Sequence, residues 1–233
     1  MPYVKFNTAL IVGAGSGLSA ALARVLATEG IKVALAARST DDLADLAKET
    51  GAKTLACDAS KRADVDRLFA SLDGDFGAPE IVIYNASYRT RGPFVGLDPA
   101  EVEKTLSVCA YGGFLVGQQA AKRMLPKKHG AILFTGASAS VKGYAESAPF
   151  AMGKFALRGL AQSMARELHP QGIHVAHVVI DGGIKSARRP EPPGKTASLL
   201  NPNSIAASYL HLIHQPHSAW SWEIELRPWV EKF

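Results

Sequence analysis

The stretch LIVGAGSGLSAALA, from Leu10 to Ala23, joins an apolar run to a helix-forming run through a glycine-rich turn. Glycine supplies the unusual dihedrals that such a turn needs, and it lets a phosphate approach the backbone closely. The first amides of the following helix then face the phosphate, aided by the helix dipole. The turn therefore predicts a dinucleotide site, with a tight turn that binds nothing as the alternative. The expected contact residues are Gly13, Gly15, Ser16, Gly17 and Leu18.

Short β-branched runs alternate with longer stretches of helical periodicity along the rest of the chain. Strands are expected at 8–13, 32–38, 52–58, 80–86, 130–137, 172–183 and 221–228. Helices are expected at 17–30, 40–51, 62–74, 98–124, 147–168 and 201–215. The helix at 40–51 should open on a Thr40–Asp41 cap and close at Gly51. We expect a single α/β domain over 1–233, a Rossmann-type doubly wound parallel sheet of about seven strands with helices on both faces.

The composition is that of an ordinary globular chain, with 47% hydrophobic residues, 20% charged residues and a formal net charge of +5. The basic residues are scattered, so nucleic-acid binding is not expected. Cys57 and Cys109 lack metal-ligand spacing, and no carboxylate or cysteine joins His211, His214 and His217, so no metal site is expected. No apolar run approaches the roughly 18 residues of a membrane span, and glycines interrupt the signal-like N-terminus. A cytoplasmic protein that does not bind membranes is expected.

Arg38 stands at the end of the second expected strand, where a carboxylate would bind the ribose hydroxyls of NAD. The preceding Ala37 supplies no acid, and a guanidinium suits a 2′-phosphate. NADP(H) is therefore favoured over NAD(H), with a solvated strand end as the alternative. The Pro-rich interval at 186–203 is too short for a domain linker and is predicted to be a flap over the substrate site.

Further positions give the chain a resemblance to the short-chain dehydrogenase/reductase family over nearly its full length. They are Asp58 after the third strand, the Asn85–Ala86 turn after the fourth, and the Phe150–Lys154 helix segment. The resemblance implies that Asp58 hydrogen-bonds the adenine of a bound dinucleotide. The other cofactor contacts that it implies are Ala59, Asn85, Ala86, Lys154 and Gly182.

Three positions depart from the cofactor motifs of that family. Ser19 stands where the family's glycine motif ends, and Ser87 replaces the glycine after Asn85–Ala86. Both serines are small, and we interpret them as compatible with dinucleotide binding. The family's Pro-Gly after the sixth strand is here Asp181–Gly182.

The departures in the catalytic set are larger. The family uses a tyrosine as proton donor, a lysine four residues later, a serine about 13 residues before the tyrosine, and an asparagine on the preceding helix. On the resemblance, Lys154 is retained, whereas Phe150, Ala137 and Cys109 occupy the tyrosine, serine and asparagine positions. The standard carbonyl mechanism is therefore in doubt.

Other hydroxyl groups near these positions are candidates to replace the missing proton donor. Tyr144 lies six residues before Phe150 on the loop that enters the helix, and Ser138 follows Ala137. Tyr84, Tyr88 and His177 are weaker candidates, because such residues more often pack in the core or on the surface.

Two functions remain open. The first is an NADP(H)-dependent oxidoreductase with an atypical site, acting on a small carbonyl or activated C=C substrate. The second is a catalytically silent NADP(H)-binding protein that serves as a sensor or partner subunit. The family also implies a homodimer or homotetramer, paired through the helices at 98–124 and 147–168.

Overall fold

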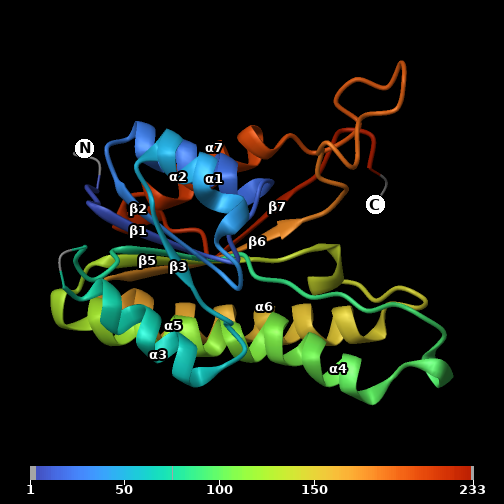
Figure 1. Ribbon diagram of the computed structural model, residues 1–233, viewed down its shortest axis with the longest axis horizontal. Helices are drawn as coiled ribbons and strands as arrows, with labels where there is room; N and C mark the ends of the chain where they lie inside the picture. The colour runs from blue at the N-terminus through green and yellow to red at the C-terminus, as the bar shows by residue number, and fades with distance from the viewer. Residues whose placement is uncertain (1–3, 75, 232–233) are drawn as a thin grey trace.

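A computed structural model describes residues 4–74 and 76–231 and contains one seven-stranded parallel sheet in the order β3-β2-β1-β4-β5-β6-β7 (Figure 1). The strands are β1 Thr8–Val12, β2 Lys32–Ala37, β3 Lys53–Ala56, β4 Ile81–Tyr84, β5 Gly130–Thr135, β6 Ile173–Ile180 and β7 Glu223–Leu226. The direction in which strands are added reverses between β1 and β4. The chain first adds β2 and β3 on one side of β1, and then returns to add β4 to β7 on the other side. The predicted Rossmann-type doubly wound sheet is confirmed.

Helices cover both faces of the sheet, as the apolar strands required (Figure 1). On one face lie α1 Leu18–Thr28, α2 Ala44–Thr50 and α7 Pro202–Ile213. On the other lie α3 Arg62–Leu72, α4 Pro99–Leu106, α5 Gly112–Met124 and α6 Ala148–Leu168. In the part of the chain that the structure describes, no helix is both long enough and apolar enough to cross a membrane.

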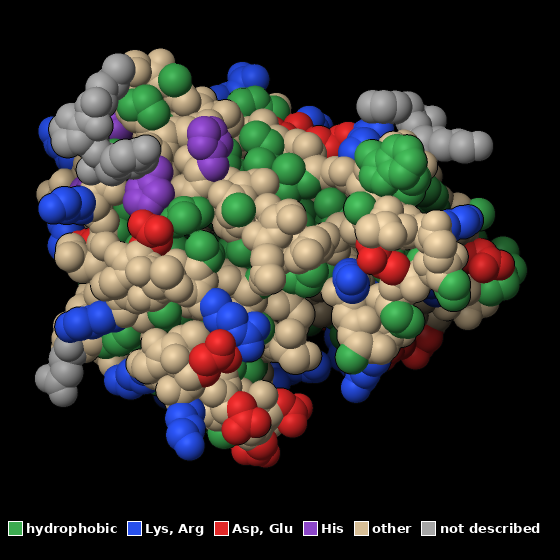
Figure 2. Space-filling view, turned by 90° about the horizontal axis from the view of Figure 1, so that it is seen from above, with side chains coloured by type: hydrophobic (Ala, Val, Ile, Leu, Met, Phe, Trp, Pro, Cys, Tyr) green, Lys and Arg blue, Asp and Glu red, His purple; other side chains and the backbone are tan. Residues whose placement is uncertain are grey.

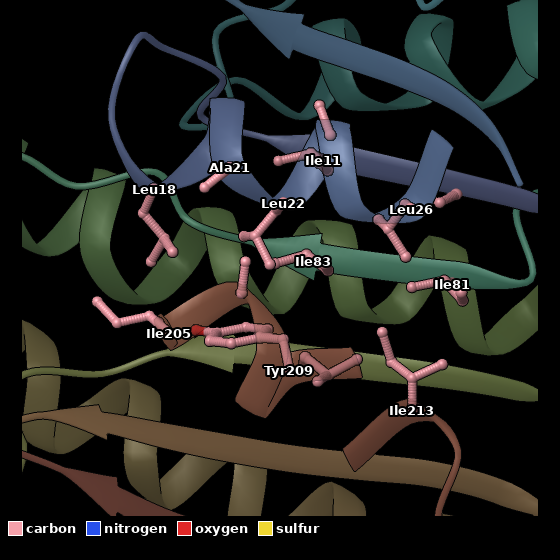
Figure 3. Close-up of a cluster of buried hydrophobic side chains, with 14 of the residues drawn as sticks. Ile11, Leu18, Ala21, Leu22, Leu26, Ile81, Ile83, Ile205, Tyr209 and Ile213 are labelled. Carbon is pink, nitrogen blue, oxygen red and sulfur yellow. The ribbon is translucent and has the colours of Figure 1, made fainter. Parts of the chain in front are cut away.

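The core is divided by the sheet into two layers. Figure 3 shows one layer, where Leu22 and Leu26 of α1 face Ile83 of β4 while Tyr209 and Ile213 of α7 approach from the neighbouring helix. The hydroxyl of Tyr209 is satisfied inside this layer by Thr135, at 2.8 Å. The central strands β1, β4, β5 and β6 are buried on both faces, and this close packing fixes where their ends lie.

The predicted helix at 98–124 forms, but it contains a π-helical turn at Ser107–Tyr111 between α4 and α5. The Asp98 side chain caps its start by accepting a hydrogen bond from the Ala100 N–H at 3.0 Å. Within the π turn, the Val108 carbonyl accepts a hydrogen bond from the hydroxyl of the buried Tyr84. A wide turn frees carbonyl groups from the regular ladder, and this tertiary contact uses one of them.

The predicted cap of the helix at 40–51 is wrong. No side chain caps the start of this segment, and a 3₁₀ turn at Asp41–Leu43 precedes α2. The tighter turn satisfies early backbone groups without a side-chain cap. The end is as predicted, because Gly51 adopts the left-handed conformation with φ of 67°.

Gly13 is required by the fold itself. It has φ of +86°, and a Cβ at this position would lie 2.3 Å from the backbone nitrogen of Ala86. The backbones that leave β1 and β4 therefore touch. Gly15 and Gly17 differ, since a Cβ on either would meet no atom within 4 Å.

Replacing Gly13 with alanine should lower the free energy of unfolding by at least about 2 kcal/mol, because a side chain is both strained and obstructed there. Gly15→Ala is the matched control and should change stability by less than about 0.5 kcal/mol. Urea unfolding of the two variants and the parent chain measures both values. Equal stability of the two variants would contradict the close approach of Gly13 to Ala86.

Candidate functional site

Two cavities adjoin at the carboxyl edge of the sheet, where the strand order reverses. In open α/β sheets this crevice is where ligands bind. The first cavity measures about 610 Å³ and the second about 1030 Å³, and Asn85 and Ser87 line both of them. The site is therefore a continuous hollow that runs across the ends of the central strands.

Half of the predicted cofactor residues come together in the first cavity. Those that line it are Gly13, Arg38, Asp58, Ala59, Asn85 and Ala86. Gly17, Leu18, Lys154 and Gly182 line the second cavity, together with the predicted catalytic candidates Ser138 and Tyr144. Gly15 and Ser16 line neither cavity and lie on the turn between β1 and α1.

The hydroxyl of Ser19 joins the two turns that border the first cavity. It donates to the Gly13 carbonyl at 2.9 Å and accepts from the Asn85 side-chain amide at 2.8 Å. Ser19 is 2% exposed, so both bonds are shielded from water. Ser19, which stands where the family's glycine motif ends, therefore links the two turns through hydrogen bonds. The sequence alone indicated only that a small side chain is compatible with the site.

The start of α1 has the features of an anion site. No side chain caps it, and its first turn carries no acidic residue. Its first amides therefore keep free donors beside the positive end of the helix dipole. The open space beside Gly15 and Gly17 leaves room for a ligand next to these donors. The residues present fit the pyrophosphate of a dinucleotide.

Arg38 and Asp58 stand on neighbouring strand ends of the first cavity. Arg38 is exposed and forms no ion pair with a carboxylate within residues 4–74 and 76–231. One Asp58 oxygen accepts the N–H and hydroxyl of Ser60, at 3.1 and 2.7 Å. Burial alone would raise the Asp58 pKa, but the Ser60 hydrogen bonds and the nearby cations lower it. The guanidinium is thus free for an anion and the carboxylate is ionised.

Lys154 is the buried cation of the second cavity. It is 3% exposed, and its ammonium group donates to the Thr135 carbonyl at 2.8 Å. Burial lowers its pKa, and no described carboxylate forms an ion pair with it. An ammonium group has three donors, so two remain for a ligand.

Phe150 lies between two cations. Its ring centroid is 5.8 Å from the Lys154 ammonium nitrogen and 4.8 Å from the central carbon of the Arg89 guanidinium. Both distances suit cation–π attraction. Phe150 and Ala137 both line the second cavity, so this wall carries apolar side chains beside charged ones.

Cys109 does not reach either cavity. It is fully buried in the π turn, and its thiol contacts the backbone of Tyr88, donating to the carbonyl at 3.2 Å. This contact ties the helix to the loop after β4. Cys57 is likewise a buried free thiol.

The two leading candidates for a replacement proton donor differ in availability. Tyr144 is 47% exposed on the wall of the second cavity. The Ser138 side chain is instead hydrogen-bonded to the Asp181 carboxylate. Tyr144 is therefore the more exposed of the two residues, and its hydroxyl group also interacts with the Lys142 ammonium group.

The weaker candidates are occupied elsewhere. The Tyr84 hydroxyl is buried against Val108, and the Tyr88 hydroxyl donates to Glu101 at 2.5 Å. His177 is fully buried on β6 with its Nδ1 2.9 Å from a Glu223 oxygen, and burial lowers its pKa to about 4. A neutral, enclosed imidazole of this kind belongs to the core.

Asp181 is a residue of this edge whose role the sequence did not reveal. It is 1% exposed, and its carboxylate lies 3.2 Å from Lys142 and 3.1 Å from Arg227. Burial would raise its pKa, but the bonds from Ser138 and Lys142 outweigh burial and lower it. Its partners lie 39 and 46 positions away, so no local pattern could have indicated this role.

The Pro-rich segment lies beside the second cavity. Ser186, Arg188 and Arg189 from it line this cavity, and Figure 1 shows the segment as an orange loop beyond the end of β6. α7 begins at Pro202, inside the last two residues of the predicted flap, and a flap over a substrate stays a prediction. The Asn201 side chain caps that helix by accepting from the Asn203 N–H at 2.9 Å.

The outer face above α1 and α7 carries interspersed Lys, Arg, Asp and Glu side chains (Figure 2). No basic stripe runs across the face that this view presents. Over residues 4–74 and 76–231, no group of three or more His, Cys, Asp or Glu side chains is placed to hold a metal ion.

Comparisons with known proteins agree with this arrangement. The family model described as short chain dehydrogenase matches residues 7–191. A short-chain dehydrogenase from Rhodopseudomonas palustris is 34% identical and superposes with a TM-score of 0.82, over 96% of this chain and 99% of that chain. A metagenomic short-chain oxidoreductase in complex with NADP is 26% identical with a TM-score of 0.85, over 97% and 98%.

Curated relatives give the same assignment. An uncharacterized oxidoreductase of Staphylococcus aureus is 27% identical over 98% of this chain and 100% of the relative. Short chain aldehyde dehydrogenase 1 of Euphorbia lathyris is 32% identical over 72% of this chain, and the match spans 61% of that relative's length. The chain belongs to the short-chain dehydrogenase family of oxidoreductases.

Proposed function

We propose that this chain is an NADP(H)-dependent oxidoreductase whose atypical site acts on a small carbonyl or activated C=C substrate. The observation that carries the proposal is a pair of cations without carboxylate partners among the described residues. Arg38 and Lys154 lie in adjoining cavities that share Asn85. One cation is placed for an adenosine 2′-phosphate and the other for the nicotinamide ribose. The NADP bound to the metagenomic relative supports the same choice of cofactor.

NADPH, when bound, supplies a hydride to the substrate carbon. The two free donors of Lys154 hold the ribose hydroxyls, and the braced turns at Gly13 and Asn85 keep the nucleotide at the strand ends. Positive charge from Lys154 stabilises negative charge that develops on a substrate oxygen. These residues act by position and charge, since neither Phe150 nor Ala137 can donate a proton.

An activated C=C suits this site better than a simple ketone. Hydride addition at the β carbon would move the alkene electron pair towards the carbonyl oxygen and leave an enolate, whose negative charge the Lys154 ammonium group would stabilise. Water then protonates the α carbon, so that no hydroxyl aligned on the oxygen is needed. Tyr144 is the side chain best placed to assist with a carbonyl substrate, because it is exposed to the cavity.

A homodimer or homotetramer also belongs to this proposal. The two long helices carry large apolar side chains that are close to half exposed, namely Tyr111, Phe114, Met152 and Phe155. Such a patch supports pairing of α5 and α6 with their copies across a two-fold axis.

Replacing Arg38 with alanine should raise the Kd for NADPH by about 10- to 100-fold, because a charge-assisted bond to the 2′-phosphate is lost. The Kd for NADH, which lacks that phosphate, should change little. Lys32→Ala is the matched control, since it removes an exposed cation from the other end of β2. Fluorescence titration measures each constant. A variant that binds both nucleotides as tightly as the parent would remove the basis for NADP(H) preference.

Parent protein with NADPH bound should reduce an activated C=C in a panel of enones and ketones. Placing tyrosine at 150 together with serine at 137 should raise ketone reduction by about 10²- to 10⁴-fold, the usual worth of a general acid. The decrease in NADPH absorbance measures the rate of both reactions.

The apolar Phe150 and Ala137 favour a silent NADP(H)-binding protein as the second candidate. That alternative would be established if the parent binds NADPH and consumes no substrate while the double variant becomes active.

A further inference from the structure

The second cavity has a strong excess of positive charge. Its basic lining residues are Arg89, Arg91, Lys154, Lys185, Arg188 and Arg189. Glu146 is the one carboxylate that faces them among its described lining residues. The whole chain has 26 basic and 21 acidic residues, so the balance in this cavity does not follow from composition.

The four arginines of this set lack counter-ions within residues 4–74 and 76–231. Three other arginines of the chain are closely paired: Arg24, Arg123 and Arg158 each lie within 2.7 Å of a carboxylate oxygen. Lys185 is also paired, with Glu191 at 3.2 Å. The arginines of the cavity wall form no such pair, so their charge is available to a ligand.

Local contacts hold two of these arginines at the cavity. The Arg89 guanidinium lies on the Phe150 ring, one turn before Lys154 on α6. The Gly92 N–H donates to the Glu146 carbonyl at 3.1 Å, which ties the arginine-bearing loop after β4 to the loop that enters α6. Arg189 packs on the loop that follows β6, where a Cβ at Gly183 would lie 3.0 Å from its terminal nitrogen.

The arginines are close enough to repel one another. Burial lowers the pKa of Arg89, and the charges of Arg91 and Arg189 lower it further. Like charges gathered without a counter-ion are unfavourable, and an anion that enters among them relieves the repulsion. A guanidinium group can bind either a carboxylate or a phosphate through two parallel hydrogen bonds.

We propose that the substrate carries an anionic group, a carboxylate or a phosphate ester, that binds among Arg89, Arg91 and Arg189. Its reactive carbon then lies towards Lys154, and Phe150 serves as the platform that positions Arg89. This inference rests on the proposed oxidoreductase function and specifies its substrate class. It also gives Phe150 a role, since its ring supports the Arg89 guanidinium by cation–π attraction.

The test compares three activated alkenes: 4-oxo-2-pentenoate, its methyl ester, and the phosphate ester of the corresponding alcohol. We expect kcat/KM for an anionic compound to exceed that of the neutral ester by about 10- to 100-fold, and the better anion identifies the group. Arg89→Gln should remove most of this preference, mainly through KM, while Arg89→Lys keeps part of it. Arg166→Gln, which removes an exposed cation from the far end of α6, is the matched control.

A second readout does not require turnover. Levulinate and its methyl ester are titrated calorimetrically into the protein, with and without NADP⁺, in the parent and the Arg89→Gln variant. Selective levulinate binding that Arg89→Gln weakens by about tenfold or more supports the proposal. Equal binding of acid and ester, or no binding of either with NADP⁺ present, overturns it.

The NADPH titration separates the two proposals. If NADPH fails to bind, the proposed function fails, and the titration without nucleotide still decides whether the anion site exists. If Arg89→Gln weakens NADPH as strongly as it weakens the anionic substrate, the arginines serve the cofactor phosphates and the substrate proposal is overturned. An unchanged Kd for NADPH is the expected result.

Discussion

The hydroxyl of Ser19 is the interaction on which the site depends most. It fastens the Gly13 carbonyl to the Asn85 amide at 2.9 and 2.8 Å, across the point where the strand order reverses. The close backbone contact of Gly13 with Ala86 allows this bridge, because a side chain at Gly13 would separate the two turns. Asn85 lines both cavities, so one buried hydroxyl group helps to fix the geometry of the hollow that they form.

The two cavities are lined by different charged groups. The first cavity offers Arg38 and an ionised Asp58, and the start of α1 lines the adjoining second cavity, a combination suited to a phosphorylated nucleoside. The second offers a buried lysine and a set of arginines around an apolar Phe150 ring. The proposed function depends on this arrangement, because positive charge and an apolar ring, with no hydroxyl at positions 137 and 150, line the second cavity.

The sequence predicted the sheet and much of the site because both follow from local patterns. Parallel strands end at a common edge, so Gly13, Arg38, Asp58 and Asn85 had to lie near one another once the alternation was recognised. What could not be predicted depends on partners distant in the chain. The π turn uses a carbonyl that Tyr84 reaches from β4, and neither residue signals this locally. The absent cap at Thr40 likewise reflects a 3₁₀ turn that local propensity does not distinguish from a regular helix start.

A crystal structure of the chain grown with NADP⁺ tests the central claim most directly. The account predicts the pyrophosphate against the amides at the start of α1, the 2′-phosphate on Arg38 and the nicotinamide ribose on Lys154. It also predicts that the Ser19 bridge persists and that the arginine-lined part of the second cavity stays open beside the nicotinamide. A nucleotide bound elsewhere, or one whose phosphates occupy Arg89 and Arg189, would contradict the division of the two cavities.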